Sequence, residues 1–298
     1  MCSQIGRASA GARPPLLLDG ALGTELERLG CETGLPLWSA GALVTAPDRV
    51  AEVHLAYARA GAELLTTNTF RTQERTLARA GLAGRARELT LRAVALARSA
   101  CDASESARWV LGSSAPLEDC YRPDLVPGPA ELEREHRAHA ELLAEGGVDA
   151  IAIETMNTIR ESVTALRAAR QTGVPVLVSF VFGADARLLS GEPLADALAS
   201  IADLEPIAVG VNCLPPSAVE PCMPVLAASA FPFAVYANLG APTSSGGFRP
   251  SEDTTPTAFA ELALGWRRAG AAIVGGCCGT RPAHVSAMRA RLGDAGSP

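Results

Sequence analysis

The sequence contains no lysine, so all 26 residues in the combined count of lysine and arginine are arginines. This absence excludes two classes of protein. A Schiff base with a carbonyl substrate or pyridoxal phosphate needs a lysine amine, and a P-loop needs a lysine at the phosphates. The chain therefore belongs to neither class.

Clusters of basic residues and long apolar runs are also missing. The formal net charge is −6 and the pI about 5.4, which argues against nucleic acid or an anionic membrane surface as a partner. No stretch reaches the roughly 18 consecutive apolar residues of a membrane helix, and residues 1–15 lack the apolar core of a signal peptide. We therefore expect a cytosolic protein that binds small molecules, with a flexible tail over residues 1–15. The sequence leaves the oligomeric state open.

The eight cysteines do not form the dense pattern of a disulfide-stapled domain. Such frameworks are typical of secreted domains much smaller than this chain of 298 residues. We therefore expect reduced thiols. The cysteines lie at scattered positions, namely Cys2, Cys31, Cys101, Cys120, Cys213, Cys222, Cys277 and Cys278.

Short apolar runs alternate with helical patterns along nearly the whole chain. The runs begin near residues 16, 64, 109, 150, 176, 207, 233 and 271. Each is apolar throughout, as expected for parallel strands that are buried on both faces. Roughly eight such strands predict a single (β/α)8 TIM barrel over residues 16–298, a fold of about 250 residues. An open doubly wound sheet is the alternative, but segment 19–24 lacks the spacing of a dinucleotide-binding glycine motif.

Two of the predicted strands end in cysteines. The run from Ala271 leads to Cys277 and Cys278 between glycines, and the run from Ile207 ends at Cys213. The carboxyl ends of barrel strands meet at one rim, where three thiols can bind zinc and leave a fourth position for a substrate. A buried cysteine is often only a small apolar residue. The coincidence of three thiols, two strand ends and glycine-rich turns nevertheless favours a metal site.

Other polar residues end predicted strands at the same rim. Asp19 and Glu154 are carboxylates, whereas Asn68 and Asn238 are amides. We expect these four residues to bind the substrate. Asp19 can equally cap the turn that follows it, but a carboxylate at the end of a central strand, such as Glu154, is costly to bury without a partner. His54 lies beside the apolar face of a predicted helix, and we interpret it as structural.

Five segments together resemble the homocysteine S-methyltransferase family, and the resemblance covers nearly the whole chain. They are Asp-Gly-Ala-Leu-Gly-Thr at 19–24, Thr-Asn-Thr-Phe at 67–70, Glu-Thr-Met at 154–156, Gly-Val-Asn-Cys at 210–213 and Gly-Gly-Cys-Cys-Gly-Thr at 275–280. The resemblance implies a zinc-bearing barrel that methylates the thiol of homocysteine to form methionine. It also implies that Cys213, Cys277 and Cys278 bind the zinc, and that Asp19 and Glu154 hold the amino group of the substrate. Zinc would deprotonate the substrate thiol, so the transfer needs no general base.

The segments point to different methyl donors. Segment 67–70 is most similar to the cobalamin-dependent methionine synthase branch, whose folate and cobalamin modules do not fit in this length. Segment 154–156 is more similar to the branch that uses S-methylmethionine or S-adenosylmethionine. The betaine branch usually has an aromatic residue at Thr155, and its quaternary ammonium needs an aromatic cage, for which we consider Tyr121, Tyr236 or Phe70. We expect a sulfonium donor, with betaine or a corrinoid protein as alternatives.

Two interpretations from other functional classes stay open. Cys277 and Cys278 can form a redox-active pair in an oxidoreductase, or the three thiols can hold a structural zinc in a binding protein. Redox chemistry would not need Cys213, and a structural zinc normally has four protein ligands. The proline-rich loop over residues 115–129, which contains Cys120 and Tyr121, is either part of a pocket wall or a simple connection.

Overall fold

Eight parallel strands form one sheet in the order β1-β10-β7-β6-β5-β4-β3-β2. The computed structural model describes residues 1–9, 13–183, 185–242, 248–250 and 254–294. The strands are β1 (Leu16–Leu17), β2 (Leu64–Thr66), β3 (Trp109–Ser114), β4 (Ala150–Met156), β5 (Val176–Phe180), β6 (Ala208–Asn212), β7 (Phe233–Ala237) and β10 (Ile273–Gly276). The two strands that carry the cysteines at their ends, β6 and β10, are separated by β7.

The sheet closes on itself between β1 and β2. Leu18 and Leu64 form a parallel bridge. The Glu63 N–H donates to the Leu17 carbonyl over 2.7 Å, and the Asp19 N–H donates to the Leu64 carbonyl over 3.0 Å. These contacts leave no free edge, so the predicted (β/α)8 barrel is confirmed and the open-sheet alternative is wrong.

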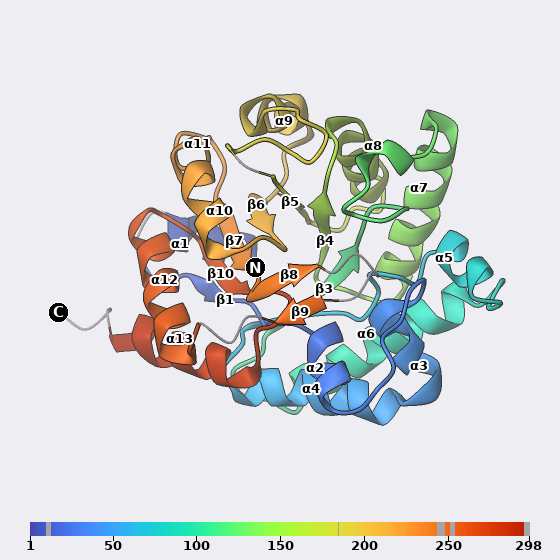
Figure 1. Cartoon of the computed structure of the whole chain (residues 1–298), viewed down its shortest axis with the longest axis horizontal. Helices are drawn as coiled ribbons and strands as arrows, with labels where there is room; N and C mark the ends of the chain where they lie inside the picture. Colours follow the sequence, from blue (N-terminus) through green and yellow to red (C-terminus); the bar gives the residue numbers. More distant parts are fainter. Residues whose placement is uncertain (10–12, 184, 243–247, 251–253, 295–298) are drawn as a thin grey trace.

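Helices surround the barrel on its outer face (Figure 1). The α-helices after β1 are α2 (Gly23–Arg28), α3 (Ala42–Thr45), α4 (Pro47–Arg59), α5 (Glu74–Arg79), α6 (Ala86–Asp102), α7 (Pro129–Glu145), α8 (Ile159–Arg170), α9 (Leu194–Ile201), α10 (Pro216–Val219), α11 (Met223–Ala227), α12 (Pro256–Arg268) and α13 (Pro282–Asp294). Short 3-10 helices occur at η1 (Trp38–Gly41), η2 (Pro123–Leu125), η3 (Ala202–Leu204) and η4 (Glu220–Cys222). Because a helix follows each strand, all strands run in the same direction and their carboxyl ends share one rim.

Two apolar clusters form the core, one on each face of the sheet. In β4, Ile151 and Ile153 belong to the cluster between the sheet and the helices. Their neighbours Ala150 and Ala152 belong to the other cluster, which joins residues from all eight barrel strands and so fills the barrel interior. Successive side chains of a strand point to opposite faces. This alternation explains why every predicted strand is apolar throughout.

The expected flexible tail contains a helix, α1 (Cys2–Ser9), which corrects that expectation for residues 2–9. Its Ile5 and Ala8 are buried and belong to the cluster in the barrel interior. They lie three positions apart and therefore share one helix face. Helix α1 thus packs against the interior of the barrel. The helix was not predicted because so short a segment with so few apolar residues shows no clear periodicity.

A small antiparallel hairpin follows β7 and was not predicted either. It consists of β8 (Gly240–Pro242) and β9 (Phe248–Pro250). In Figure 1 the hairpin lies in front of the barrel strands, near the centre of the molecule. Through Phe248 of β9, the hairpin forms part of a cavity wall.

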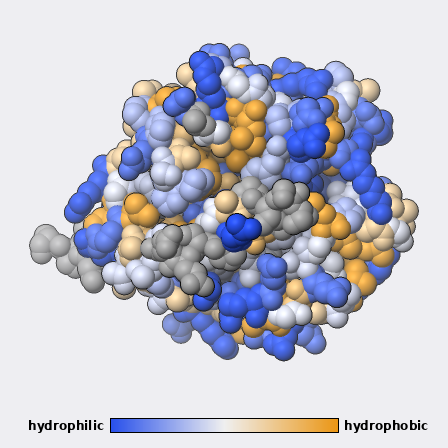
Figure 2. Space-filling view, in the orientation of Figure 1, coloured by the Kyte–Doolittle hydropathy of each residue, from blue (hydrophilic) through white to orange (hydrophobic). Residues whose placement is uncertain are grey.

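Charged side chains pair across the outer helices. Arg75 of α5 contacts Glu131 and Glu135 of α7, each at 2.8 Å. Figure 2 shows hydrophilic and hydrophobic side chains interspersed over one face of the molecule. Among the described residues, no helix is long and apolar enough to cross a membrane.

The turn after β10 has no space for side chains at two of its glycines. A Cβ on Gly276 would lie 2.3 Å from the Thr280 Oγ1 atom. A Cβ on Gly279 would lie 2.2 Å from the Leu239 carbonyl oxygen, and Gly279 has a φ of +84°. Glycine is therefore required at both positions, and at Gly279 the backbone conformation adds to the steric reason.

We expect Gly279→Ala to lower the free energy of unfolding by roughly 3 kcal/mol or more, because a positive φ and a steric overlap both act against the new Cβ. Urea denaturation of the metal-free protein, followed by circular dichroism, measures this value. Gly147→Ala is the matched control, since Gly147 has a φ of +78° but no heavy atom within 4 Å of a built Cβ. It should cost only about 1–2 kcal/mol. Equal losses in the two variants would contradict a role for the close approach to Leu239.

Candidate metal centre and cavity

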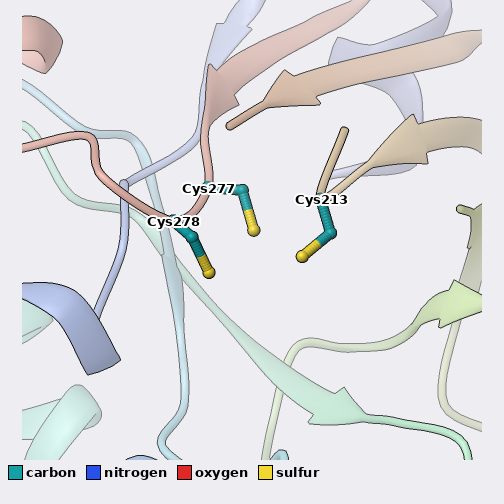
Figure 3. A group of neighbouring side chains, drawn as sticks. All are labelled: Cys213, Cys277 and Cys278. Atoms are coloured by element: carbon teal, nitrogen blue, oxygen red, sulfur yellow. The ribbon is translucent and has the colours of Figure 1, made fainter. Parts of the chain in front are cut away.

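Three cysteine thiols converge at the rim of the barrel. The Sγ atoms of Cys213, Cys277 and Cys278 all lie within 4.8 Å of one another. Figure 3 shows the three side chains pointing toward a common centre, from the end of β6 and from the turn after β10. The predicted association of these cysteines is therefore present in the structure.

Strand β7 sets the distance between the two cysteine-bearing segments. The Cys213 N–H donates to the Tyr236 carbonyl over 3.2 Å, and the Cys277 N–H donates to the Ala237 carbonyl over 2.9 Å. Cys213 has a φ of +57°, a conformation that is uncommon for a residue with a side chain. The backbone on both sides of β7 is thus fixed by hydrogen bonds to adjacent residues of that strand.

The turn of Cys277 and Cys278 is also fixed from α2 and α4. The Gly279 N–H donates to the Thr24 hydroxyl over 3.0 Å, and the Thr280 hydroxyl donates to the Cys277 carbonyl over 2.7 Å. The buried Tyr57 hydroxyl lies 3.1 Å from the Thr280 carbonyl. These bonds satisfy the polar groups of the turn and preorganise both thiols.

The three thiols hydrogen-bond to one another. The pKa of Cys213 is held well below its usual range because the thiols of Cys277 and Cys278 hydrogen-bond to its sulfur. The pKa of Cys277 and that of Cys278 are raised, first because each makes such a bond to Cys213. The hydrogen bonds of the cluster therefore favour the thiolate form of Cys213.

The donor set fits a zinc ion. Thiolates are soft ligands that favour zinc, and three converging sulfur atoms supply all but one of the ligands of a tetrahedral site. Within the described residues, no histidine or carboxylate joins this group. A site of three protein ligands is the pattern of zinc enzymes, which keep the last position for a water or substrate.

The two predicted carboxylates lie on the wall of the same cavity. Thr66 donates to Asp19 from its N–H over 2.7 Å and from its hydroxyl over 3.0 Å. The Ser113 hydroxyl donates to Glu154. No basic side chain among the described residues pairs with either carboxylate. Burial accordingly raises the pKa of Asp19 to about 8 and that of Glu154 to about 7, so a cation bound in the cavity would be stabilised by both groups.

The two predicted amides occupy different environments. Asn68 lines the cavity, where its Nδ2 donates to the Ser39 carbonyl over 2.9 Å and its buried Oδ1 has no partner. Asn238 is buried but is absent from the cavity wall. Its side chain instead hydrogen-bonds to Cys213 and helps to lower the pKa of that thiol. Asn68 is therefore available to a ligand in the cavity, whereas Asn238 supports the thiol cluster.

A hydrogen-bonded network connects the ends of β4 and β6. The Thr155 N–H donates to the Asn212 Oδ1 atom over 2.9 Å, and the Asn212 Nδ2 donates to the Thr155 hydroxyl over 2.8 Å. Ser179 of β5 also donates to the Asn212 Oδ1 atom, over 2.7 Å. Thr155 has a φ of +62°, at an irregularity in the pairing of β4 with β5. The network therefore holds the backbone beside both Glu154 and Cys213.

The cavity above the thiols has a volume of about 490 Å³, within the range of small-molecule sites. Tyr121 lines it, and its hydroxyl lies 3.2 Å from the Cys213 sulfur. The loop over residues 115–129 is thus part of the cavity wall and not a simple connection. The aromatic side chains on the wall are Trp38, Phe70, Tyr121, Tyr236 and Phe248.

Tyr121, Tyr236 and Phe70, which were considered for an aromatic cage, all lie on this wall. Only 4% of the residues are aromatic, yet five of them gather at one cavity. Trp38, Arg71 and Phe248 also line the cavity and were not predicted from the sequence. Arg71 follows directly on the strand-end segment 67–70, which was a usable signal. No sequence signal pointed to Phe248, because its place on the cavity wall depends on the hairpin of β8 and β9.

The histidines do not contribute to the cavity. His54 is fully buried in α4, and burial lowers its pKa to about 4, which keeps its ring neutral. No histidine among the described residues lines the cavity. His54 therefore belongs to the core, as interpreted from the sequence.

Comparisons with known proteins agree with this geometry. The family model described as Homocysteine S-methyltransferase matches residues 16–292. The homocysteine S-methyltransferase of Escherichia coli is 32% identical over 96% of this chain and 97% of that protein. Methionine synthase of Mycobacterium leprae is 30% identical, over 92% of this chain but only 24% of that protein.

The solved structures give the same result. The crystal structure of the homocysteine methyltransferase MmuM from Escherichia coli, in its metallated form, has a TM-score of 0.83 and 31% sequence identity. The alignment covers 96% of this chain and 99% of that chain. From the fold, the converging thiols and the match over residues 16–292, this chain is a methyltransferase that belongs to the homocysteine S-methyltransferase family.

Proposed function

We propose that this protein transfers a methyl group to the thiol of homocysteine, forming methionine, and that zinc bound by Cys213, Cys277 and Cys278 is its cofactor. The observation that carries the proposal is the convergence of three thiols at a cavity whose wall holds two carboxylates without a basic partner. A thiol-bearing amino acid complements both features, because its sulfur suits a soft metal and its ammonium suits the carboxylates.

Zinc, when bound, supplies a Lewis acid that lowers the pKa of a thiol and makes it nucleophilic at neutral pH. The three cysteines hold the ion and leave one ligand position for the acceptor. Tyr121 and Asn238 hydrogen-bond to Cys213, which stabilises the negative charge on this sulfur. With the acceptor already deprotonated, no residue needs to act as a general base.

Asp19 and Glu154 bind the ammonium group of the acceptor in this proposal. Thr66 and Ser113 orient the two carboxylates by hydrogen bonds. Asn68 offers its unpartnered Oδ1 to an N–H of a ligand. For Asn238 we replace the predicted contact with substrate by support of Cys213, since it does not border the cavity.

We assign the methyl donor to the S-methyl sulfonium class, as S-methylmethionine or S-adenosylmethionine. The acceptor sulfur forms a bond to the methyl carbon while the carbon–sulfur bond of the sulfonium breaks. The bonding electron pair stays on the donor sulfur, which leaves as a neutral thioether. The transfer needs no further domain, and the aromatic rings of the wall attract a cationic donor.

Betaine is the second candidate donor, and the same aromatic wall favours it. Its quaternary ammonium is also attracted to rings. The residue beside Glu154 is Thr155, however, and its hydroxyl is engaged by Asn212. A trialkylamine is also a poorer leaving group than a thioether, which favours the sulfonium class.

A reducing compartment such as the cytosol suits this site. All eight cysteines are free, and oxidation of neighbouring thiols would remove the metal ligands. The proposal therefore includes a cytosolic location and small molecules as the ligands.

The reduced parent protein should bind about one zinc per chain, and Cys213→Ala should retain less than about a tenth of that after dialysis, because one of three ligands is lost. Elemental analysis measures the content, and circular dichroism verifies folding. Cys222→Ser is the matched control, since Cys222 is buried away from the cluster and bonds only to the Ala218 carbonyl. Full zinc retention in Cys213→Ala would refute the ligand set.

Glu154→Gln should raise the KM for homocysteine roughly 10- to 100-fold, because it removes one charged partner of the ammonium. Zinc content should not change. Steady-state kinetics at varied homocysteine concentration provide the measurement, with Glu141→Gln, at an exposed position of α7, as the control. If the folded variant kept the parental KM and kcat, the role of Glu154 would have to be abandoned.

With homocysteine as acceptor, kcat/KM for S-methylmethionine or S-adenosylmethionine should exceed that for betaine by about 100-fold or more, equivalent to about 3 kcal/mol in the barrier. Methionine formation is counted for each donor offered separately, including a methylcorrinoid, against zinc-stripped protein. Turnover with betaine and with neither sulfonium would overturn the donor assignment and leave the zinc proposal standing.

A further inference from the structure

Arg71 is a buried cation on the cavity wall that lacks a carboxylate partner. It is 7% exposed and lines the cavity. Its Nη1 donates to the Glu118 carbonyl over 2.9 Å, and its guanidinium lies 5.3 Å from the centre of the Phe70 ring. Among the described residues, no acidic side chain pairs with it.

The acidic groups of the neighbouring loop have other partners, and Asp119, which also lines the cavity, accepts from the Tyr121 N–H over 2.9 Å. The Glu118 carboxylate accepts from Arg75 over 3.0 Å and from Arg79 over 2.7 Å, so only its backbone carbonyl serves Arg71. Arg122 also lines the cavity, but it is largely exposed and forms a bidentate pair with Asp124. Arg71 is therefore the unpaired cation of the described cavity wall.

A buried charge without a counterion is costly, and a bidentate carboxylate is the partner that best matches a guanidinium. No described residue supplies one to Arg71. A ligand that enters the cavity with a carboxylate would meet this need. Arg71 thus indicates a ligand group of negative charge, whereas Asp19 and Glu154 indicate a group of positive charge.

The position of Arg71 distinguishes donor from acceptor. Asp19 follows β1 closely and Glu154 lies in the last part of β4, and both line the cavity with the thiols. Arg71 lies several residues beyond β2, and it contacts Glu118, which lies several residues beyond β3. The same loop then reaches Cys213 through the Tyr121 hydroxyl. Arg71 therefore belongs to the loops beyond the strand ends that line the same cavity.

We propose that Arg71 binds the carboxylate of the methyl donor, and that the rings of Phe70 and Tyr121 lie beside its cationic centre. The donor is then an amino-acid sulfonium with a free carboxylate. This inference rests on the proposed function and makes its donor class more specific. It assigns Arg71 to donor specificity, with no part in activating the acceptor.

The test compares S-methylmethionine with its carboxamide, which keeps the sulfonium and loses the negative charge. Arg71→Gln, which keeps an N–H donor toward Glu118, should raise the KM for S-methylmethionine roughly 10- to 100-fold. It should change the KM for the carboxamide and for homocysteine by less than about twofold. Arg71→Lys should restore part of the loss, since it keeps the charge but not the bidentate geometry. Arg49→Gln is the control, since Arg49 is exposed on α4, pairs with Glu52 and does not line the cavity, and it should leave all three values near the parental ones.

Two kinetic results would overturn the proposal. Equal KM increases for S-methylmethionine and its carboxamide would mean that Arg71 only supports the loops. An increase confined to homocysteine would place the carboxylate of the acceptor at Arg71.

Calorimetric titration of the zinc-loaded protein with S-methylmethionine separates this inference from the proposed function. If the parent forms no methionine from any donor, the proposed function fails. Weaker binding to Arg71→Gln than to the parent would still support the role of Arg71. Equal binding to both, or no binding to the parent, would overturn it.

Discussion

The backbone hydrogen bonds of β7 are the constraint on which the metal centre depends. Cys213 and Cys277 belong to segments far apart in the sequence, and each donates its N–H to a neighbouring carbonyl of this strand, at Tyr236 and Ala237. Strand spacing in a closed barrel is fixed by such bonds. The distance between the two thiols is therefore a property of the barrel and not of either cysteine segment alone.

The cavity wall carries buried ionisable groups of both kinds that lack a partner of opposite charge, and burial raises the pKa of the two carboxyl groups. Asp19 and Glu154 are buried without a basic partner, and Arg71 is buried without an acidic one. Each arrangement reduces stability in the free protein. A zwitterionic ligand can compensate both kinds of charge, so the cost of burial is recovered on binding. This arrangement is consistent with the proposed amino-acid substrates.

Backbone strain in this protein lies close to the chemistry. Thr155 and Cys213 have positive φ values, which cost of order 1–3 kcal/mol each. The Asn212 side chain bonds to Thr155 and supports its conformation, while the Cys213 N–H donates to the Tyr236 carbonyl. The Asn212 hydrogen bonds engage the Thr155 hydroxyl and fix the backbone beside Glu154. The residues with positive φ and the hydrogen bonds that stabilise them thus lie together where the proposal places the acceptor.

The sequence alone determined the barrel and the chemical character of its rim. Uninterrupted apolar runs between helical patterns specify buried parallel strands, because alternate side chains pack on two apolar faces, as Ile151 and Ala152 do. The residues that end these runs had to meet at one rim, which located Cys213, Cys277 and Cys278 correctly.

Only the tertiary structure decided which side chains border the cavity and which remain unpaired. The side chain of Asn238 hydrogen-bonds to Cys213 and does not line the cavity. Phe248 lines the cavity because an unpredicted hairpin places it there, and α1 packs against the barrel interior. The sequence shows that position 71 is an arginine, but it does not show that this arginine lacks an acidic partner. That property depends on Arg75 and Arg79 occupying the carboxylate of Glu118, and contacts between residues so distant in sequence have no local signature.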